Sequence, residues 1–345
     1  MIRSDCVTDL LIGVDLGTTS TKAVLFTTEG RLLAERSTAT PLHWRGAEAC
    51  DQDPEDFYRG TVGTIRACLL LAGASPERVQ AIGIAGQMAG VLGVDQDWWP
   101  SMPYDSWLDA RCWPDVEFLE RELGDELVER TGCPPMVNHA PKMRWWRRER
   151  SDAFARTAKF LMPSGYVAGR LAGLTAGDAF IDRTYLHFTG AVDARSGAWS
   201  GELLRAIGIP AEKMPRIVAP STVVGRLDRR AAEDCGLRPG VPVAAGLGDT
   251  AAGALGAGIV RPNQLLDTAG TAAVFAASSR AFRPDRQERT LIVMHGALED
   301  QWISLSYLSG GSLLRWFHEA IAEGAGSVEE LDFEELTRGV EEVPA

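Results

Sequence analysis

A short acidic segment near the N-terminus carries residue types that bind phosphate and magnesium. Asp15 follows an apolar run that predicts a strand over residues 10–14, and a second run predicts a returning strand over residues 23–26. The polar residues between them are Gly17, Thr18, Thr19 and Lys22. Backbone N–H groups and hydroxyls at a glycine turn bind phosphate oxygens, and a carboxylate suits Mg²⁺, usually through water. The pattern predicts a hairpin whose tip holds phosphate and magnesium.

The bland alternative is an ordinary Gly-Thr turn. Under the functional interpretation, Lys22 adds a positive charge toward a terminal phosphate. Under the alternative, it occupies the exposed face of the returning strand. The residues of this segment alone leave both interpretations open, because short motifs often match by chance.

A second acid, Asp249, follows another apolar strand and is flanked by glycines. Gly248 precedes it, and small residues that suit a tightly packed helix extend to Gly253. Glycines leave room for a substrate, and a carboxylate at a strand end can accept a proton from a hydroxyl. Asp249 is therefore the predicted catalytic base and, with Asp15, a predicted metal ligand. A helix N-cap is the alternative, since Asp before Thr-Ala-Ala suits that role too.

Residues 265–275 repeat the order of strand, Gly-Thr turn and strand. Gly270 and Thr271 occupy this turn and would contact phosphate from the opposite side, with a plain hairpin turn as the alternative. Two such hairpins in one chain predict two related lobes.

Seven short segments carry a family resemblance. They are DLGTTS at 15–20, DQDPE at 51–55, GIAGQM at 83–88, WLDAR at 107–111, APKMRW at 140–145, GDTAAG at 248–253 and GT at 270–271. In these residues and their order the chain resembles the FGGY carbohydrate kinases, in particular the xylulokinase branch. The resemblance implies a two-lobed α/β protein with the actin-like or ribonuclease H-like ATPase fold of sugar kinases, Hsp70 and actin. It implies a sugar-binding N-terminal domain over residues 1–238 and the beginning of a nucleotide-binding C-terminal domain over residues 239–345.

The same resemblance implies an ATP-dependent kinase that phosphorylates a terminal hydroxyl of a ketopentose. D-Xylulose, converted to D-xylulose 5-phosphate, is the first candidate substrate, and ATP and Mg²⁺ are the implied cofactors. Gln87 and Met88 would line the floor of the sugar pocket, Trp107 and Asp109 would lie close by, and Asp249 would face the reacting hydroxyl. Without the resemblance, Met88 is core packing, and Trp107 and Asp109 are surface packing and a solvated acid.

Two departures from the family pattern keep alternatives open. No glycine-rich adenosine-binding segment occurs before Ala345, so we expect an incomplete second lobe. Ala89 stands where xylulokinases of this type usually carry His, so a preference for ribulose, fuculose or a tetritol stays open. A non-kinase ATPase module of the actin and Hsp70 type, or an inactive kinase fragment, is the competing interpretation.

Composition narrows the classes of partner. The 35 basic and 47 acidic residues leave a net charge of −12, which argues against nucleic acid and anionic membranes. The six cysteines form no Cys-x-x-Cys pair, and no uncharged apolar stretch approaches the roughly 18 residues of a spanning helix. We therefore expect a cytoplasmic protein whose partner is a small sugar. A homodimer is a possible assembly that the sequence does not decide.

Local signals place the elements around these residues. Asp53 is a good N-cap for a helix that Pro54 starts and Gly73 ends. Residues 81–84 predict a buried strand that delivers Gln87 to a loop at its carboxyl end, where open α/β sheets bind ligands.

Later segments are more polar. Residues 117–130 and 142–160 predict two charged peripheral helices. An ion pair on the second of them is the default interpretation of Lys142. A boundary between the lobes, acting as a hinge, is expected at residues 236–240.

Overall fold

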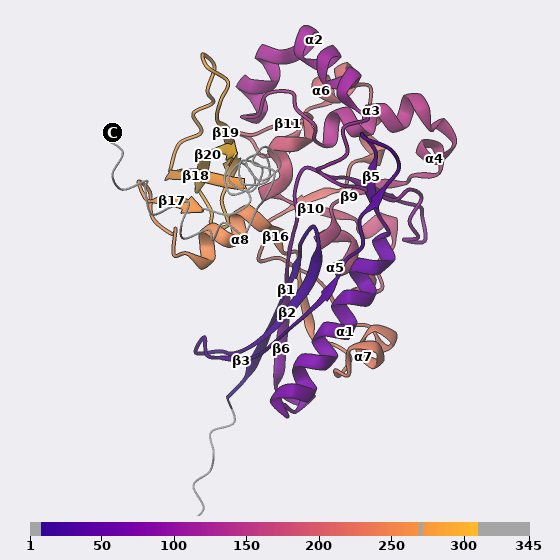
Figure 1. Ribbon diagram of the computed structural model, residues 1–345, viewed down its shortest axis with the longest axis vertical. Helices are drawn as coiled ribbons and strands as arrows, with labels where there is room; N and C mark the ends of the chain where they lie inside the picture. Colours follow the sequence, from indigo (N-terminus) through magenta and orange to yellow (C-terminus); the bar gives the residue numbers. More distant parts are fainter. Residues whose placement is uncertain (1–7, 269–271, 310–345) are drawn as a thin grey trace, which may run out of the picture.

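A mixed seven-stranded sheet organises the fold of this computed structural model, which describes residues 8–268 and 272–309. Its strands are β1 (Leu10–Leu16), β2 (Ser20–Thr27), β3 (Leu32–Ala39), β6 (Val79–Gly86), β14 (Val223–Arg226), β15 (Pro242–Ala244) and β16 (Leu247–Gly248). The order is β14-β15-β6-β1-β2-β3, and β16 is a further partner of β6; Figure 1 shows β6, β1, β2 and β3 side by side. β1, β2 and β3 form an antiparallel meander, whereas β6 runs parallel to β1, β15 and β16. The predicted N-terminal hairpin is confirmed.

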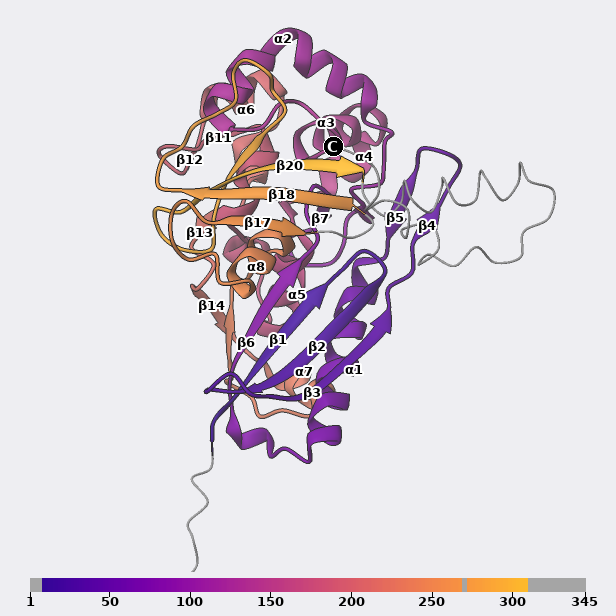
Figure 2. The same cartoon turned by 60° about the vertical axis from the view of Figure 1, so that its left-hand side comes forward.

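Three helices cover one face of this sheet: α1 (Pro54–Ala72), α5 (Pro163–Ala172) and α7 (Arg229–Cys235) (Figure 2). β1 alternates buried and more open positions, and its buried residues pack with apolar residues of all three helices in one core. The predicted limits of α1 are confirmed. The Asp53 carboxylate accepts a hydrogen bond from the Glu55 N–H at 2.9 Å, and Gly73 closes the helix with a left-handed φ of 57°.

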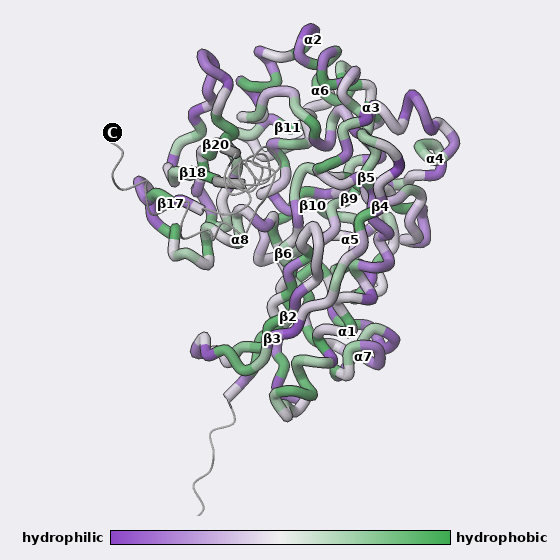
Figure 3. Tube along the Cα trace, viewed as in Figure 1, coloured by the Kyte–Doolittle hydropathy of each residue, from purple (hydrophilic) through white to green (hydrophobic). Residues whose placement is uncertain are grey.

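A helical region follows the carboxyl ends of these strands. It contains α2 (Trp113–Thr131), α3 (His139–Glu149), α4 (Ser151–Arg156), α6 (Gly201–Ile207) and the short 3-10 helices η2 (Ala176–Asp178), η3 (Arg183–Thr189) and η4 (Ala211–Lys213), whereas η1 (Pro76–Arg78) lies at the other end of the sheet, between α1 and the start of β6. Small β-sheets lie among these helices. One has three strands: β4 (His43–Trp44), β5 (Cys50–Gln52) and β8 (Tyr104–Asp105). Three have two strands each: β7 (Leu92–Val94) with β9 (Lys159–Leu161), β10 (Phe180–Asp182) with β13 (Arg216–Val218), and β11 (Val192–Asp193) with β12 (Ala198–Trp199). Hydrophilic residues gather around α4, whereas the sheet strands β2 and β3 carry hydrophobic and hydrophilic residues in mixture (Figure 3).

A second, antiparallel sheet lies beyond helix α8 (Asp249–Gly256). Its order is β17-β18-β20-β19, with β17 (Leu265–Thr268), β18 (Ala272–Ser279), β19 (Ile292–His295) and β20 (Trp302–Ser309). Apolar residues of this sheet and of α8 share one core with the helical region. The strand pairing of β17 with β18 confirms the second predicted hairpin.

The predicted helix over residues 142–160 is wrong in its extent and its setting. α3 ends at Glu149, α4 occupies Ser151–Arg156, and β9 begins at Lys159 because that segment pairs with β7. α3 is also not peripheral, because its buried side chains include Lys142. The first of the two predicted helices, over residues 117–130, lies within α2 and is confirmed.

The segment after residues 236–240 does not leave the first sheet. β15 pairs with β6 at Ile82, and β16 pairs with it at Ala85 and Gly86. The strands of the other sheet begin at Leu265. The division into domains 1–238 and 239–345 stays a prediction, and the strand pairing favours a boundary after α8.

Candidate active site

The carboxyl ends of three parallel strands bring predicted site residues to one edge of the first sheet. Ala85 in β6 pairs with Asp15 of β1 on one side and with Leu247 of β16 on the other. Gln87 and Asp249 come directly after the ends of β6 and β16. Two strand spacings of about 4.8 Å place the backbones of Asp15 and Leu247 roughly 10 Å apart, and Asp249 follows Leu247 by two residues. This edge is where open α/β sheets bind ligands.

Asp249 is the first residue of α8, and Gly248 is the N-cap. Its carboxylate accepts hydrogen bonds from the Thr250 N–H at 2.6 Å and from the Thr250 hydroxyl at 3.2 Å. Although solvent reaches the side chain, desolvation by the surrounding protein, opposed by the two Thr250 hydrogen bonds and aided by the Asp15 charge, raises its pKa to about 6. A carboxylate with this pKa is ionised at neutral pH yet basic enough to accept a proton.

Asp15 lies directly opposite Lys22 in the β1–β2 ladder. Desolvation raises the pKa of Asp15, whereas the positive charge of Lys22 lowers it. The Lys22 ammonium lies 3.2 Å from a carboxylate oxygen of Glu35, and both side chains are exposed. The Asp15 carboxylate has no hydrogen bond or ion pair with any residue that the structure describes. Asp15 is therefore open to a ligand, whereas Lys22 already has a partner on the exposed face.

The predicted turn residue Thr18 is held by Trp107. The Trp107 indole N–H donates to the Thr18 hydroxyl oxygen at 2.9 Å, although 46% of the Trp107 residue surface is exposed. The Thr18 hydroxyl donates in turn to the Gln87 side-chain oxygen at 3.4 Å. Thr19 is exposed beside it, and Gly17 closes the turn by donating its N–H to the Ser20 carbonyl at 3.0 Å. The structure thus brings together the hairpin tip, Trp107 and Gln87.

Gln87 is buried, and a second glutamine orients it. The Gln87 amide donates to the Gln52 side-chain oxygen at 2.9 Å, and the Gln52 amide donates to the Thr18 carbonyl at 3.0 Å. Met88 is also buried and packs against Gly248, where an added Cβ would lie 2.6 Å from the Met88 sulfur. Met88 therefore supports the strand end that carries Asp249, while Gln87 faces the hairpin tip.

Asp109 is not the solvated surface acid that the sequence left open as an alternative. Its buried carboxylate accepts from the Cys50 N–H at 2.8 Å and pairs with the Arg111 guanidinium at 2.8 Å. The Asp109 carboxylate therefore already has hydrogen-bond donors from Cys50 and Arg111. These contacts stabilise the loop that carries Trp107. Contact with a sugar through Asp109 stays a prediction.

Tyrosines at this edge were not identified from the sequence. Tyr307 of β20 lies near Asp249: although 46% of its surface is exposed, desolvation by the surrounding protein and then the Asp249 charge raise its pKa. The buried Tyr185 hydroxyl lies 2.9 Å from the Gly86 carbonyl and 3.3 Å from the Leu247 carbonyl, so it joins the ends of β6 and β16. No local sequence motif identifies either tyrosine, because contacts between segments distant in the sequence bring each of them to the site. Gln52 had a weak signal, since it belongs to the DQDPE segment.

Gly270 and Thr271, the predicted phosphate contacts from the second hairpin, lie outside the described residues. The strands on either side of them are described and pair in an antiparallel hairpin. The predicted role of these two residues stays a prediction.

Comparison with known families assigns most of the chain. Residues 10–256 match the model described as "FGGY family of carbohydrate kinases, N-terminal domain". The chain belongs to the FGGY family of carbohydrate kinases. The matched range includes every predicted site residue before α8 and Asp249 itself.

Several relatives of this FGGY chain have printed names. Xylulose kinase of Bacillus subtilis (strain 168) is 29% identical over 97% of the chain, and xylulose kinase of Escherichia coli (strain K12) is 33% identical over 89% of it. Gluconokinase of Bacillus subtilis (strain 168) is 26% identical over 92% of the chain. The chain spans 65%, 62% and 61% of the lengths of these three relatives.

The fold of the FGGY chain is shared with solved sugar kinases. The crystal structure of xylulose kinase from Rhodospirillum rubrum aligns with a TM-score of 0.89 at 26% identity, covering 97% of this chain and 67% of the other. A Plasmodium falciparum glycerol kinase solved with ADP aligns with a TM-score of 0.84 at 15% identity, covering 97% of this chain and 67% of the other. The predicted actin-like ATPase fold is confirmed.

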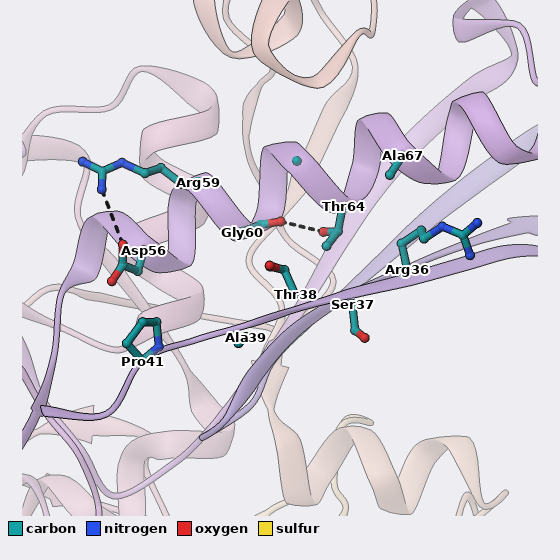
Figure 4. A pocket seen from close by; sticks show the side chains of 11 residues that line it. Arg36, Ser37, Thr38, Ala39, Pro41, Asp56, Arg59, Gly60, Thr64 and Ala67 are labelled. Atoms are coloured by element: carbon teal, nitrogen blue, oxygen red, sulfur yellow. Dashed lines mark hydrogen bonds and ion pairs between the residues drawn. The ribbon is translucent and has the colours of Figure 1, made fainter.

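A pocket of about 470 Å³ in the FGGY chain lies between α1 and β3 (Figure 4). The Arg59–Asp56 ion pair at 3.4 Å and the Thr64–Gly60 hydrogen bond at 2.7 Å lie on its helical side. None of the predicted site residues lines it. Within residues 8–268 and 272–309, no helix has the length and apolar character needed to span a membrane.

Proposed function

We propose that this protein is an ATP-dependent sugar kinase that transfers the γ-phosphoryl group to a terminal hydroxyl of a ketopentose, with D-xylulose as the first candidate. The observation that carries the proposal is the position of Asp249, a carboxylate with a pKa of about 6 beside Gln87 and Asp15 at the ends of three parallel strands. The FGGY assignment and the xylulose kinase relatives support it.

In this mechanism Asp249 accepts the proton of the sugar hydroxyl. The hydroxyl oxygen then forms a bond to the γ-phosphorus, and the bond between that phosphorus and the β,γ-bridging oxygen breaks, which releases ADP. The hairpin tip at Gly17, Thr18 and Thr19 binds phosphate oxygens. Such a reaction depends on positioning and on charge neutralisation.

The donor set at this edge fits Mg²⁺. Asp15 and Asp249 offer hard oxygen ligands, and Asp15 has no other partner among the described residues. Among residues 8–268 and 272–309, no group of three or more His, Cys, Asp or Glu side chains is arranged to hold a metal ion. Mg²⁺ commonly binds through one or two carboxylates together with waters and substrate phosphates. When bound, the ion would neutralise charge on the phosphates.

The sugar end of the site is proposed at Gln87, Trp107 and the loop around them. An exposed indole face beside a carboxylate suits a polyol, because the ring supplies an aromatic surface and the carboxylate accepts hydrogen bonds, while the buried Gln87 amide holds Thr18 beneath them. A gluconokinase among the relatives keeps the substrate open beyond ketopentoses. We also propose a cytoplasmic setting, supported by five buried cysteines without disulfide bonds in the described residues.

The test is ATP consumption coupled to sugar-phosphate formation, with D-xylulose, ribulose, fuculose, a tetritol and gluconate. It uses this chain and, where the gene extends past Ala345, the longer chain. Sugar-dependent ADP release with D-xylulose as the best substrate is expected. ATP hydrolysis without any sugar phosphate would instead identify a nucleotide-switched ATPase of the actin and Hsp70 type.

The pH profile tests the role of Asp249 separately. A base works only when it is deprotonated, so kcat/KM should fall about tenfold for each pH unit below about 6. Because the Asp15 charge raises the Asp249 pKa, Asp15→Asn should move this acid limb to lower pH. Steady-state kinetics between pH 4.5 and 8, at saturating ATP, measures both effects. A flat profile through this range would contradict the assignment.

A further inference from the structure

Lys142 is a fully buried lysine with an unusual set of partners. Its relative exposure is 0%, and its ammonium donates to the Ser106 carbonyl at 2.9 Å and to the Asp109 carbonyl at 2.6 Å. These two residues are the ends of one turn, since the Asp109 N–H also donates to the Ser106 carbonyl at 3.0 Å. A single side chain from α3 therefore joins both ends of the turn 106–109.

This contact is not the helix ion pair that the sequence favours. No carboxylate in the described residues lies within 4.0 Å of the Lys142 ammonium. The neighbouring acids Asp105 and Asp109 each pair instead with the Arg111 guanidinium at 2.8 Å. Burying an ammonium is costly unless hydrogen bonds replace its water. Here two backbone carbonyl oxygens replace the water around the ammonium. The hydrogen bonds that offset the desolvation therefore also hold the backbone of one turn.

The turn presents Trp107 to the hairpin tip. Trp107 follows Ser106, its ring is partly exposed, and its indole N–H reaches the Thr18 hydroxyl. Thr18 in turn contacts Gln87, and Gln87 contacts Gln52. Any rotation of the turn would therefore move the indole away from Thr18 and release one end of this hydrogen-bonded series.

We propose that Lys142 is a positioning residue that fixes Trp107 against Thr18 at the sugar end of the site. It acts through the two turn carbonyls and has no contact with a substrate. The placement of Trp107 follows from the contacts themselves, whereas its consequence for sugar affinity rests on the proposed function. Two readouts are therefore needed, one in the absence of sugar and one with it.

The first readout is fluorine NMR of protein labelled with 5-fluorotryptophan. The resonance of Trp107 among the ten tryptophans is assigned by its loss in Trp107→Phe. Thr18→Val removes the hydroxyl acceptor and gives the reference position of an untethered indole. Lys142→Met should move the Trp107 resonance toward that reference, and Lys142→Gln, which retains one amide donor group, should move it part of the way. If Lys142→Met does not fold, Lys142→Gln carries the test.

Lys213→Met is the matched control. Lys213 also donates to two backbone carbonyls, those of Phe154 at 2.9 Å and Thr157 at 2.5 Å, at the end of α4. Its replacement should lower the stability of the protein without moving the Trp107 resonance. A Trp107 resonance that stays in place in the Lys142 variants, or that moves equally in Lys213→Met, would overturn the proposal.

The second readout is the dissociation constant for D-xylulose by calorimetry. Lys142→Met and Trp107→Phe should each weaken binding about tenfold, the size expected for one lost orienting hydrogen bond, and the double variant should weaken it no further. Additive losses would show that the two residues act independently and would overturn the proposed route. If the parent protein binds no sugar of the panel, the proposed function fails, and the fluorine comparison still decides whether Lys142 fixes Trp107.

Discussion

Asp249→Asn is expected to lower the turnover of sugar phosphorylation by about 10²- to 10⁴-fold, the range that a positioned general base contributes. The side-chain amide oxygen can still accept the hydrogen bonds of Thr250, so the start of α8 should be preserved. The amide cannot take the proton of the sugar hydroxyl at any accessible pH. The coupled assay of ADP release measures the loss, and calorimetric titration with D-xylulose checks that the sugar still binds.

Asp152→Asn is the matched control, because Asp152 is an exposed acid in the first turn of another helix, α4. It should retain the parent turnover. The base assignment would fail if Asp249→Asn kept more than about a tenth of the parent turnover, since that residual rate exceeds what the loss of a general base permits. A loss of sugar binding together with turnover would instead point to a structural role for Asp249.

Gly246→Ala is expected to lower the free energy of unfolding by roughly 2 to 5 kcal/mol, the sum of left-handed backbone strain and steric overlap. Gly246 joins β15 to β16 with a φ of 78°, and a Cβ there would lie 2.0 Å from the Ile84 carbonyl oxygen. A backbone oxygen in the middle of a sheet cannot move aside, so β16 must separate from β6. Urea denaturation measures the stability, and turnover should fall as well, because β16 carries Asp249.

Gly240→Ala separates the two causes. Gly240 also has a positive φ, of 89°, but an added Cβ would meet nothing within 4 Å. Only the backbone strain of about 1 to 2 kcal/mol applies there, and turnover should be unaffected. Equal losses of stability in the two variants would show that the overlap with Ile84 is relieved by movements that cost little.

The parts of the site with local signals could be predicted from the sequence. Thr18, Gln87 and Asp249 each follow an apolar strand and a glycine, Asp15 lies near the end of such a strand just before Gly17, and parallel strands necessarily bring such ends together. The boundaries of α1 were equally local, since Asp53 and Gly73 act on their own neighbours.

The remaining parts depend on contacts between distant segments. Lys142 belongs to a charged stretch that is typical of a surface helix, and only the position of the turn 106–109 shows that it is buried. Tyr307 reaches Asp249 from a different sheet, and no periodicity predicts that approach. The strand β9 was missed because its pairing with β7 outweighs the helical pattern around it.

The position of β6 in the sheet also has a consequence for synthesis of the protein. β6 lies between β1 and the late strands β15 and β16, and about 150 residues separate its end from the start of β15. At 5–20 residues per second, a ribosome needs roughly 8 to 30 s to make this interval. Throughout that time one edge of β6 has no strand partner, and unpaired edges attract other chains. During this period the nascent chain has an exposed sheet edge that a chaperone can protect. Asp15 and Asp249 come to the same edge of the sheet only after β16 has paired with β6.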